Sequence, residues 1–175
     1  MRMPTLSVDF AYFFDYLVKA RETLLGWIRE QPPAVYTQKF PIGKGTIQAT
    51  LIHIASSEYG YVHRLRGRGY LPEDNPFDYE QLPELEPFLA AWDRQRPVTR
   101  ETLASIGDPN RPIEYVTKFF QPPMRIRTVA GGIAGQLLFH EIHHRAQVMA
   151  MLRQVGVKAE NLDYSLLMME RLPVG

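Results

Sequence analysis

The segment from His140 to Met151 limits the fold of this chain more than any other. It reads His-Glu-Ile-His-His-Arg-Ala-Gln-Val-Met-Ala-Met, and it holds three of the five histidines of the chain. On an α-helix successive residues are about 100° apart, so His140 and His144 lie about 40° apart, one turn above the other. Two imidazoles in this arrangement can direct nitrogens at one point, as the ligands of a first-row metal ion do. The segment therefore predicts a helix that carries part of a metal site.

The apolar residues around this segment indicate which histidines point inward. At about 3.6 residues per turn, the apolar face of residues 129–155 is centred close to His144, and His140 lies beside it. His143 lies about 120° from that centre. Burying two imidazoles without partners costs on the order of several kcal/mol, and a shared metal removes that cost. We therefore predict His140 and His144 as ligands and His143 as a residue of the surface or of the site's edge.

A metal site of this kind needs a third protein ligand. His53 and His63 are candidates, and both lie in a helical apolar pattern over residues 47–66. Each lies away from the centre of the apolar face, His53 less far than His63. Glu58 lies nearer the centre of that face. It can be a ligand, a partner of a ligand, or one member of a salt bridge to an arginine of the bundle. Helical phase alone leaves the third ligand open.

Hydrophobic periodicity and turn residues divide the rest of the chain into helices and one hairpin. Ser7, Thr46 and Thr128 are the expected N-caps, and Pro97 predicts a kink or a break into two pieces. Gly43-Lys44-Gly45-Thr46 lacks the full spacing of a phosphate-binding loop, so we assign it no role. The expected helices cover residues 8–29, 47–66, 84–105, 129–155 and 163–171, and the expected strands cover 113–119 and 124–127.

Four long helices, one hairpin and no repeat predict an all-α fold, a four-helix bundle with a small β-hairpin before the last long helix. A length of 175 residues with 45% hydrophobic content suits a single domain over residues 1–175. The net charge of +1 argues against nucleic-acid and membrane partners. The chain has no cysteine, which excludes disulfides and thiolate ligands. No segment resembles a signal peptide or a membrane span, so we expect a cytoplasmic protein.

Two motifs together resemble the DinB-like family. The first is His53-Ile54-Ala55, which matches an H-(I/L)-A block, and the second is an H-x-x-x-H-R-(G/A)-Q pattern that begins at His140 and ends at Gln147. The resemblance extends over nearly the whole chain in the order of its elements. It implies an up-down-down-up four-helix bundle, often a homodimer, and a divalent metal, commonly zinc or nickel, held by three histidines.

By position in these motifs, the resemblance implies that the three ligands are His53, His140 and His144. Family members with known activities are thiol-dependent transferases and isomerases, in which bacillithiol, mycothiol or glutathione binds the metal as a thiolate. Three neutral imidazoles leave the metal its full charge and an open position, which lowers the pKa of a bound thiol or water. Because this chain has no cysteine, the thiol must be a small cosubstrate.

The polar residues next to the histidines have several interpretations. Glu141 can orient a ligand histidine or act as a base, but an ion pair with Arg145 four residues on is the simpler account. Arg145 and Gln147 can position ligands or make structural hydrogen bonds. None of these roles follows from the sequence alone.

Two other functions compete with a thiol-dependent enzyme. His140-Glu141-x-x-His144 matches a zinc-peptidase motif with Glu141 as base, but Gln147 and Ala150 stand where the longer motif requires Gly and His. Glu170 is the conceivable third ligand of such a peptidase. The other alternative is a non-catalytic, stress-associated bundle whose metal is structural.

Overall fold

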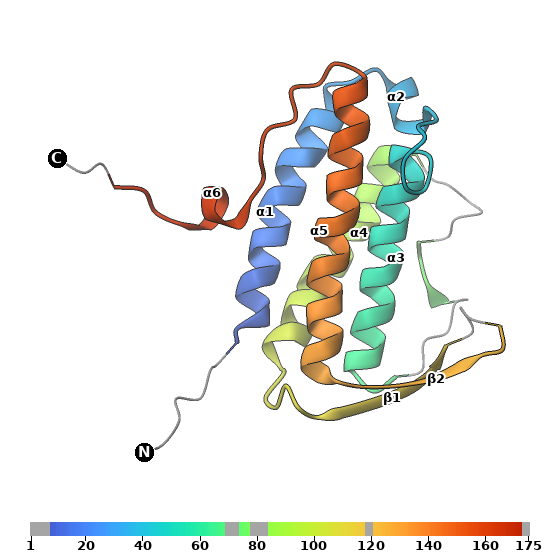
Figure 1. Cartoon of the computed structure of the whole chain (residues 1–175), viewed down its shortest axis with the longest axis vertical. Helices are drawn as coiled ribbons and strands as arrows, with labels where there is room; N and C mark the ends of the chain where they lie inside the picture. Colours follow the sequence, from blue (N-terminus) through green and yellow to red (C-terminus); the bar gives the residue numbers. More distant parts are fainter. Residues whose placement is uncertain (1–7, 69–73, 78–83, 118–120, 173–175) are drawn as a thin grey trace.

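The computed structural model describes residues 8–68, 74–77, 84–117 and 121–172. This part is mostly helical, with one small antiparallel hairpin before the longest helix (Figure 1). The predicted cap Ser7 and the predicted strand residues 118 and 119 lie outside the described residues. In chain order the elements are α1 (Phe10–Arg29), α2 (Pro33–Thr37), α3 (Ile47–Leu65), α4 (Leu85–Ala104), β1 (Pro112–Thr117), β2 (Met124–Val129), α5 (Ala130–Gln154) and α6 (Tyr164–Met168).

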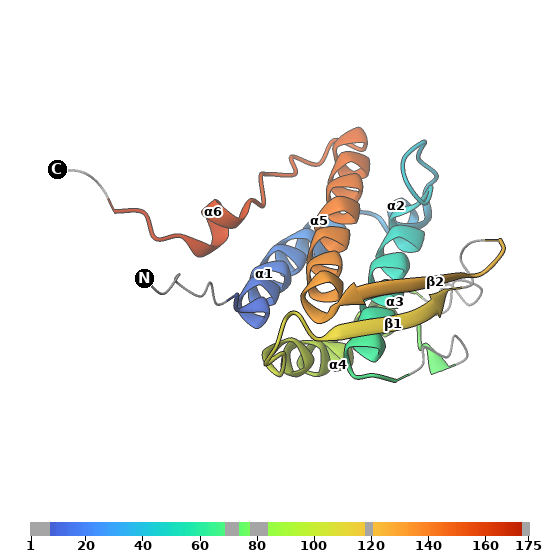
Figure 2. The same ribbon diagram turned by 60° about the horizontal axis from the view of Figure 1, so that its bottom comes forward.

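The four long helices pack side by side, and each contacts two others. Helix α5 packs on α1 and α3, and α4 packs on the same two helices. The apolar core lies between them. The hairpin of β1 and β2 crosses one end of this helical body, where it connects the end of α4 to the start of α5 (Figure 2). No helix in the described part of the chain is both long and apolar enough to cross a membrane.

Local chemistry explains where the long helices begin. Thr46 caps α3 as predicted, because its hydroxyl accepts a hydrogen bond from the amide of Ala49 at 2.9 Å. The predicted cap Thr128 is wrong. It belongs to β2, which continues into α5 without a loop, and the first amides of α5 donate instead to backbone carbonyls of Pro109 and Arg111.

Two expectations near prolines are wrong, a break into two pieces at Pro97 and a loop over residues 33–37. Pro97 does not divide its helix, because α4 is continuous from Leu85 to Ala104. Pro97 and Asp93, whose carbonyl would otherwise accept its amide hydrogen, are exposed, so water can replace the lost hydrogen bond. Residues 33–37, expected as a loop, form the short helix α2. Pro33 occupies its first turn, where no amide hydrogen is needed.

A buried charge network joins all four long helices. Arg21 of α1 lies between Glu58 of α3 and Glu141 of α5, at nitrogen–oxygen distances of 2.8 and 2.6 Å, and both carboxylate side chains are only 3% exposed. Glu58 also accepts hydrogen bonds from two residues of α4, the Trp92 indole at 2.9 Å and the Thr99 hydroxyl. Burial alone lowers the pKa of Arg21, but the two carboxylates outweigh it and raise that pKa above its usual value.

Removing the arginine should therefore destabilise the fold strongly. We expect Arg21→Met to lower the free energy of unfolding by about 3–5 kcal/mol, because two carboxylates stay buried without their cation. Chemical denaturation monitored by circular dichroism measures this loss.

The matched control is Arg29→Met on the same helix. Arg29 pairs with Glu86, and these side chains are 50% and 64% exposed. An exposed ion pair contributes less than about 1 kcal/mol. Equal losses in the two variants would contradict a central role for the buried network.

Candidate metal centre

The structure brings together the three histidines named from the sequence. His53 of α3 and His140 and His144 of α5 each offer one ring nitrogen, and these nitrogens all lie within 4.8 Å of one another. The Nε2 atoms of His53 and His140 are 3.1 Å apart. Two nitrogens bound to one zinc ion in tetrahedral geometry lie about 3.4 Å apart. The cluster can therefore hold a metal ion with small side-chain adjustments.

The protonation of the three rings suits metal binding. All three are half-buried, and burial is the largest effect on each pKa. Burial and the neighbouring positive charges lower the pKa of His53 to about 3 and that of His140 to about 4, and the pKa of His144 is lowered too. Lys44 contributes to all three shifts. The imidazoles are therefore neutral at pH 7, which is the form that binds a metal.

The position of the cluster explains why helical phase placed His53 away from the centre of the apolar face, although nearer to it than His63. Helices α3 and α5 are in direct contact, and the buried face of each helix forms part of the core. The histidines lie at the edge of this contact, because His53 is only half-buried while its neighbours Ile52 and Ile54 are buried. A residue at an edge lies off the centre of the apolar face. Phase within one helix cannot show which edge faces a partner helix.

Gln147 fixes the orientation of one ligand ring. The Oε1 atom of Gln147 lies 2.9 Å from Nδ1 of His144, and an amide oxygen can only accept, so Nδ1 donates. Nε2 of His144 is then left unprotonated for a metal. The amide nitrogen of Gln147 donates in turn to Nε2 of His143, at 3.0 Å. His143 itself is exposed, as predicted from its phase.

A glycine supports Gln147 from the loop before α3. A Cβ atom built on Gly43 would lie 2.2 Å from Oε1 of Gln147, so no side chain fits there without moving the amide. Gly43 also has a φ of +51°, in the left-handed region that favours glycine. Sequence reasoning assigned no role to this Gly-Lys-Gly stretch. Its glycines were the available signal, since a glycine often marks a close backbone approach.

A pocket of about 770 Å³ adjoins the histidines. It lies along α3 and α5 and reaches the hairpin. Its described lining is Lys44, His53, Ser56, Ser57, Gly60, Tyr61, Arg64, Tyr115, Thr117, Ile126, Thr128, Gly132, Ile133, Gln136, His140 and His144.

The two carboxylates considered as site residues belong to the core instead. Glu58 and Glu141 both pair with Arg21, which matches the ion-pair interpretation of Glu58. The expected pair of Glu141 with Arg145 is wrong, because Arg145 donates to the Tyr16 hydroxyl at 2.6 Å. Burial explains the difference, since a carboxylate inside the core needs a buried cation and not a neighbour along one helix.

The other candidate ligands do not join the cluster. His63 packs its ring against Tyr59, with ring centroids 4.2 Å apart. Glu170 is exposed beyond α6. In the described part of the chain, the group of histidines and carboxylates close enough to share an ion is the His53, His140 and His144 cluster. A peptidase of the His-Glu-x-x-His type would lack Glu170 as its third ligand, and its expected base, Glu141, is paired with Arg21.

Comparison with known proteins agrees with this site. The model of the DinB family matches residues 1–171. The chain is also similar to the curated "Protein DinB" of Bacillus subtilis (strain 168), with 22% identity over 168 residues that cover 90% of this chain and 93% of that protein.

Removing the amide that orients His144 should weaken metal binding. We expect Gln147→Leu to lower zinc affinity by about tenfold to a hundredfold, as loss of a ligand's outer hydrogen-bond partner does. Competition with a chromophoric chelator measures this affinity.

Gln136→Leu is the matched control, because Gln136 is on the same helix and lines the pocket but donates to Tyr61 and not to a histidine. It should leave zinc affinity unchanged. If both variants bind zinc as the unaltered protein does, Gln147 has no part in orienting the ligand.

Proposed function

The chain belongs to the DinB family, and from that membership and its three-histidine cluster we propose that it is a divalent-metal-dependent enzyme. Its reaction is a transfer or an isomerisation that uses a low-molecular-weight thiol. His53, His140 and His144 would hold the ion, zinc or nickel. The bound ion would supply a Lewis acid with an open position, which lowers the pKa of a thiol there.

One observation carries this proposal: the histidines form part of the wall of a large pocket. A structural metal site is closed by protein ligands on every side, whereas a catalytic site keeps a position open to substrate. Three protein nitrogens and an adjoining cavity of about 770 Å³ fit the second arrangement. The cavity also has room for an acceptor molecule beside the thiol.

The chain's own residues favour an anion at the histidines. The three rings are neutral, so they do not cancel the positive charge of an ion. The cation of Lys44 lies close enough to lower the pKa of each ring, and it would attract a thiolate in the same way. Gln147 keeps His144 in the tautomer that leaves Nε2 available.

The same membership underlies a proposal on architecture. We propose that the four long helices form the family's up-down-down-up bundle. The contact of each long helix with two others supports this.

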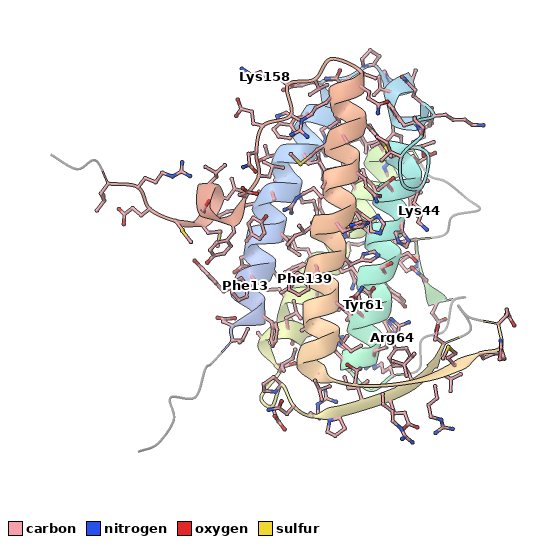
Figure 3. All side chains as sticks on the ribbon, viewed as in Figure 1. Phe13, Lys44, Tyr61, Arg64, Phe139 and Lys158 are labelled. Carbon is pink, nitrogen blue, oxygen red and sulfur yellow. The ribbon has the colours of Figure 1, made fainter. Side chains whose placement is uncertain are left out.

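We further propose a homodimer. Its support is a set of exposed apolar side chains on the adjoining helices α1 and α5, with Phe13 and Phe139 on the same side of the molecule (Figure 3). The set consists of Tyr12, Phe13, Phe139 and Ile142.

A polar residue in this apolar set should weaken a dimer. Phe139 is 70% exposed, so we expect Phe139→Ser to increase the monomer fraction in analytical ultracentrifugation without unfolding the chain. Val116→Ser, which changes an exposed apolar residue of the hairpin, should leave the fraction unchanged. A monomeric unaltered protein would rule out the dimer.

Thiol binding is the direct test of the enzyme proposal. We expect titration of the cobalt-substituted protein with bacillithiol, mycothiol or glutathione to produce a thiolate-to-cobalt charge-transfer band, because the thiol enters the open position as a thiolate. Absorption spectroscopy detects the band. A spectrum that no thiol changes would favour the non-catalytic, metal-binding alternative.

Two substitutions distinguish the three-histidine site from a peptidase-type site that uses Glu170. His53→Ala should abolish stoichiometric cobalt binding, because it removes one of three ligands, and Glu170→Ala should not. The reverse pattern would favour a peptidase-type site. His63→Ala is the control for loss of a histidine from the same helix.

A further inference from the structure

Tyr61 lies in the wall of the pocket, next to one of the histidines. It is a half-buried residue of α3, and its ring stands edge-on to that of His140, with the ring centroids 5.8 Å apart. Along this side of the molecule it lies between Lys44 and Arg64 (Figure 3). A ligand that extends from the histidines toward the hairpin therefore passes this tyrosine.

The hydroxyl of Tyr61 has a hydrogen atom that can bind a ligand. Among the described residues, its hydrogen-bond partner is Gln136 of α5, whose Nε2 atom lies 3.4 Å from the phenol oxygen. An amide nitrogen only donates, so the phenol oxygen is the acceptor in this contact. The O–H of Tyr61 is not used there and can donate to a second group.

This hydroxyl keeps its proton at neutral pH. The ordinary pKa of a tyrosine is about 10. Burial raises the pKa of Tyr61 above that value and outweighs the contact with Gln136, which lowers it. The pocket wall therefore offers a neutral hydrogen-bond donor at this point. The matching group on an organic ligand is an acceptor that carries no hydrogen of its own, such as a carbonyl oxygen.

The position of Gln136 indicates how far this donor lies from the histidines. Gln136 precedes His140 by four residues on α5, so their Cα atoms are about 6 Å apart along the helix axis. Because α5 begins at the hairpin, the Tyr61 hydroxyl lies on the hairpin side of His140. A molecule that is bound at the histidines by one end can reach this hydroxyl with a short chain.

We propose that Tyr61 is a specificity-determining residue, whose hydroxyl donates a hydrogen bond to a carbonyl oxygen of the ligand bound at the histidines. This inference rests on the proposed function, in which that ligand is a low-molecular-weight thiol. It adds the substrate class: a thiol with a carbonyl group a short chain away from its sulfur. A hydrocarbon of the same shape binds less well, because it leaves the phenol without an acceptor.

A series of paired thiols tests this role. The cobalt-substituted protein is titrated with ω-mercaptoamides, from mercaptopropanamide to mercaptohexanamide, and with branched alkanethiols in which an isopropyl group replaces the terminal amide. The thiolate-to-cobalt band reports the binding of both. At each length, the ratio of the two affinities measures the contribution of the amide. We expect this ratio to be highest at the length that brings the carbonyl oxygen to Tyr61.

Removal of the hydroxyl locates the effect. Tyr61→Phe keeps the ring beside His140 and should lower the highest ratio about threefold to tenfold, the contribution of one neutral hydrogen bond, without changing the affinity for the alkanethiols. Tyr115→Phe is the matched control, because Tyr115 also lines the pocket but lies on β1 against Arg64. It should leave every ratio unchanged. Ratios that Tyr61→Phe does not lower, or an equal loss in Tyr115→Phe, would overturn the proposal.

A second pair of ligands separates failure of this inference from failure of the proposed function. If the thiols bind but Tyr61→Phe has no effect, the inference alone fails. If no thiol changes the cobalt spectrum, acetylhistamine and pentylimidazole are titrated instead. Both bind a metal through a neutral imidazole nitrogen, and only acetylhistamine carries a carbonyl oxygen.

The ligand-field bands of cobalt report the binding of these imidazoles. A preference for acetylhistamine that Tyr61→Phe lowers and Tyr115→Phe preserves would support the carbonyl contact without thiol chemistry. An equal preference in Tyr61→Phe and the unaltered protein, or binding of neither imidazole, would overturn it.

Discussion

The ion pairs of Arg21 with Glu58 and Glu141 govern the arrangement of this protein. A buried charge cannot lose its partner without a large cost, so these contacts fix α1, α3 and α5 relative to one another. The consequence extends to the histidines. Glu58 follows His53 by five residues on α3, and Glu141 directly follows His140 on α5. The register that joins the carboxylates to one arginine is therefore the register that brings the two histidines within 3.1 Å.

The same network separates charges of opposite sign. The carboxylates of Glu58 and Glu141 lie in the core, where Arg21 neutralises them, and the described lining of the pocket contains Lys44 and Arg64. A carboxylate facing the histidines would repel an anionic ligand and would compete for a bound ion. The placement of residues around the two helices thus gives the core its ion pairs and leaves the described lining of the pocket without a carboxylate.

The sequence predicted features that lie within one element better than features between elements. The helix that carries His140 and His144 followed from its periodicity, because both residues are on the same helix. The place of His53 depends on how α3 meets α5, which phase cannot show, and the family resemblance supplied it. Glu141 was paired with Arg145 by a local rule, whereas its partner Arg21 is 120 residues away. Lys44 and Arg64 meet in one pocket only after folding.

The contact between Gly43 and Gln147 gives the loop before α3 an influence on the orientation of His144. The amide that orients His144 rests against a residue with no side chain, at a distance where even a methyl group would collide with it. The freedom of the His144 ring to rotate is thus limited by the outline of an exposed loop and not only by the packing of helices. In chains with this fold, a residue other than glycine at that one loop position would displace the amide that orients His144 while every proposed ligand stays the same.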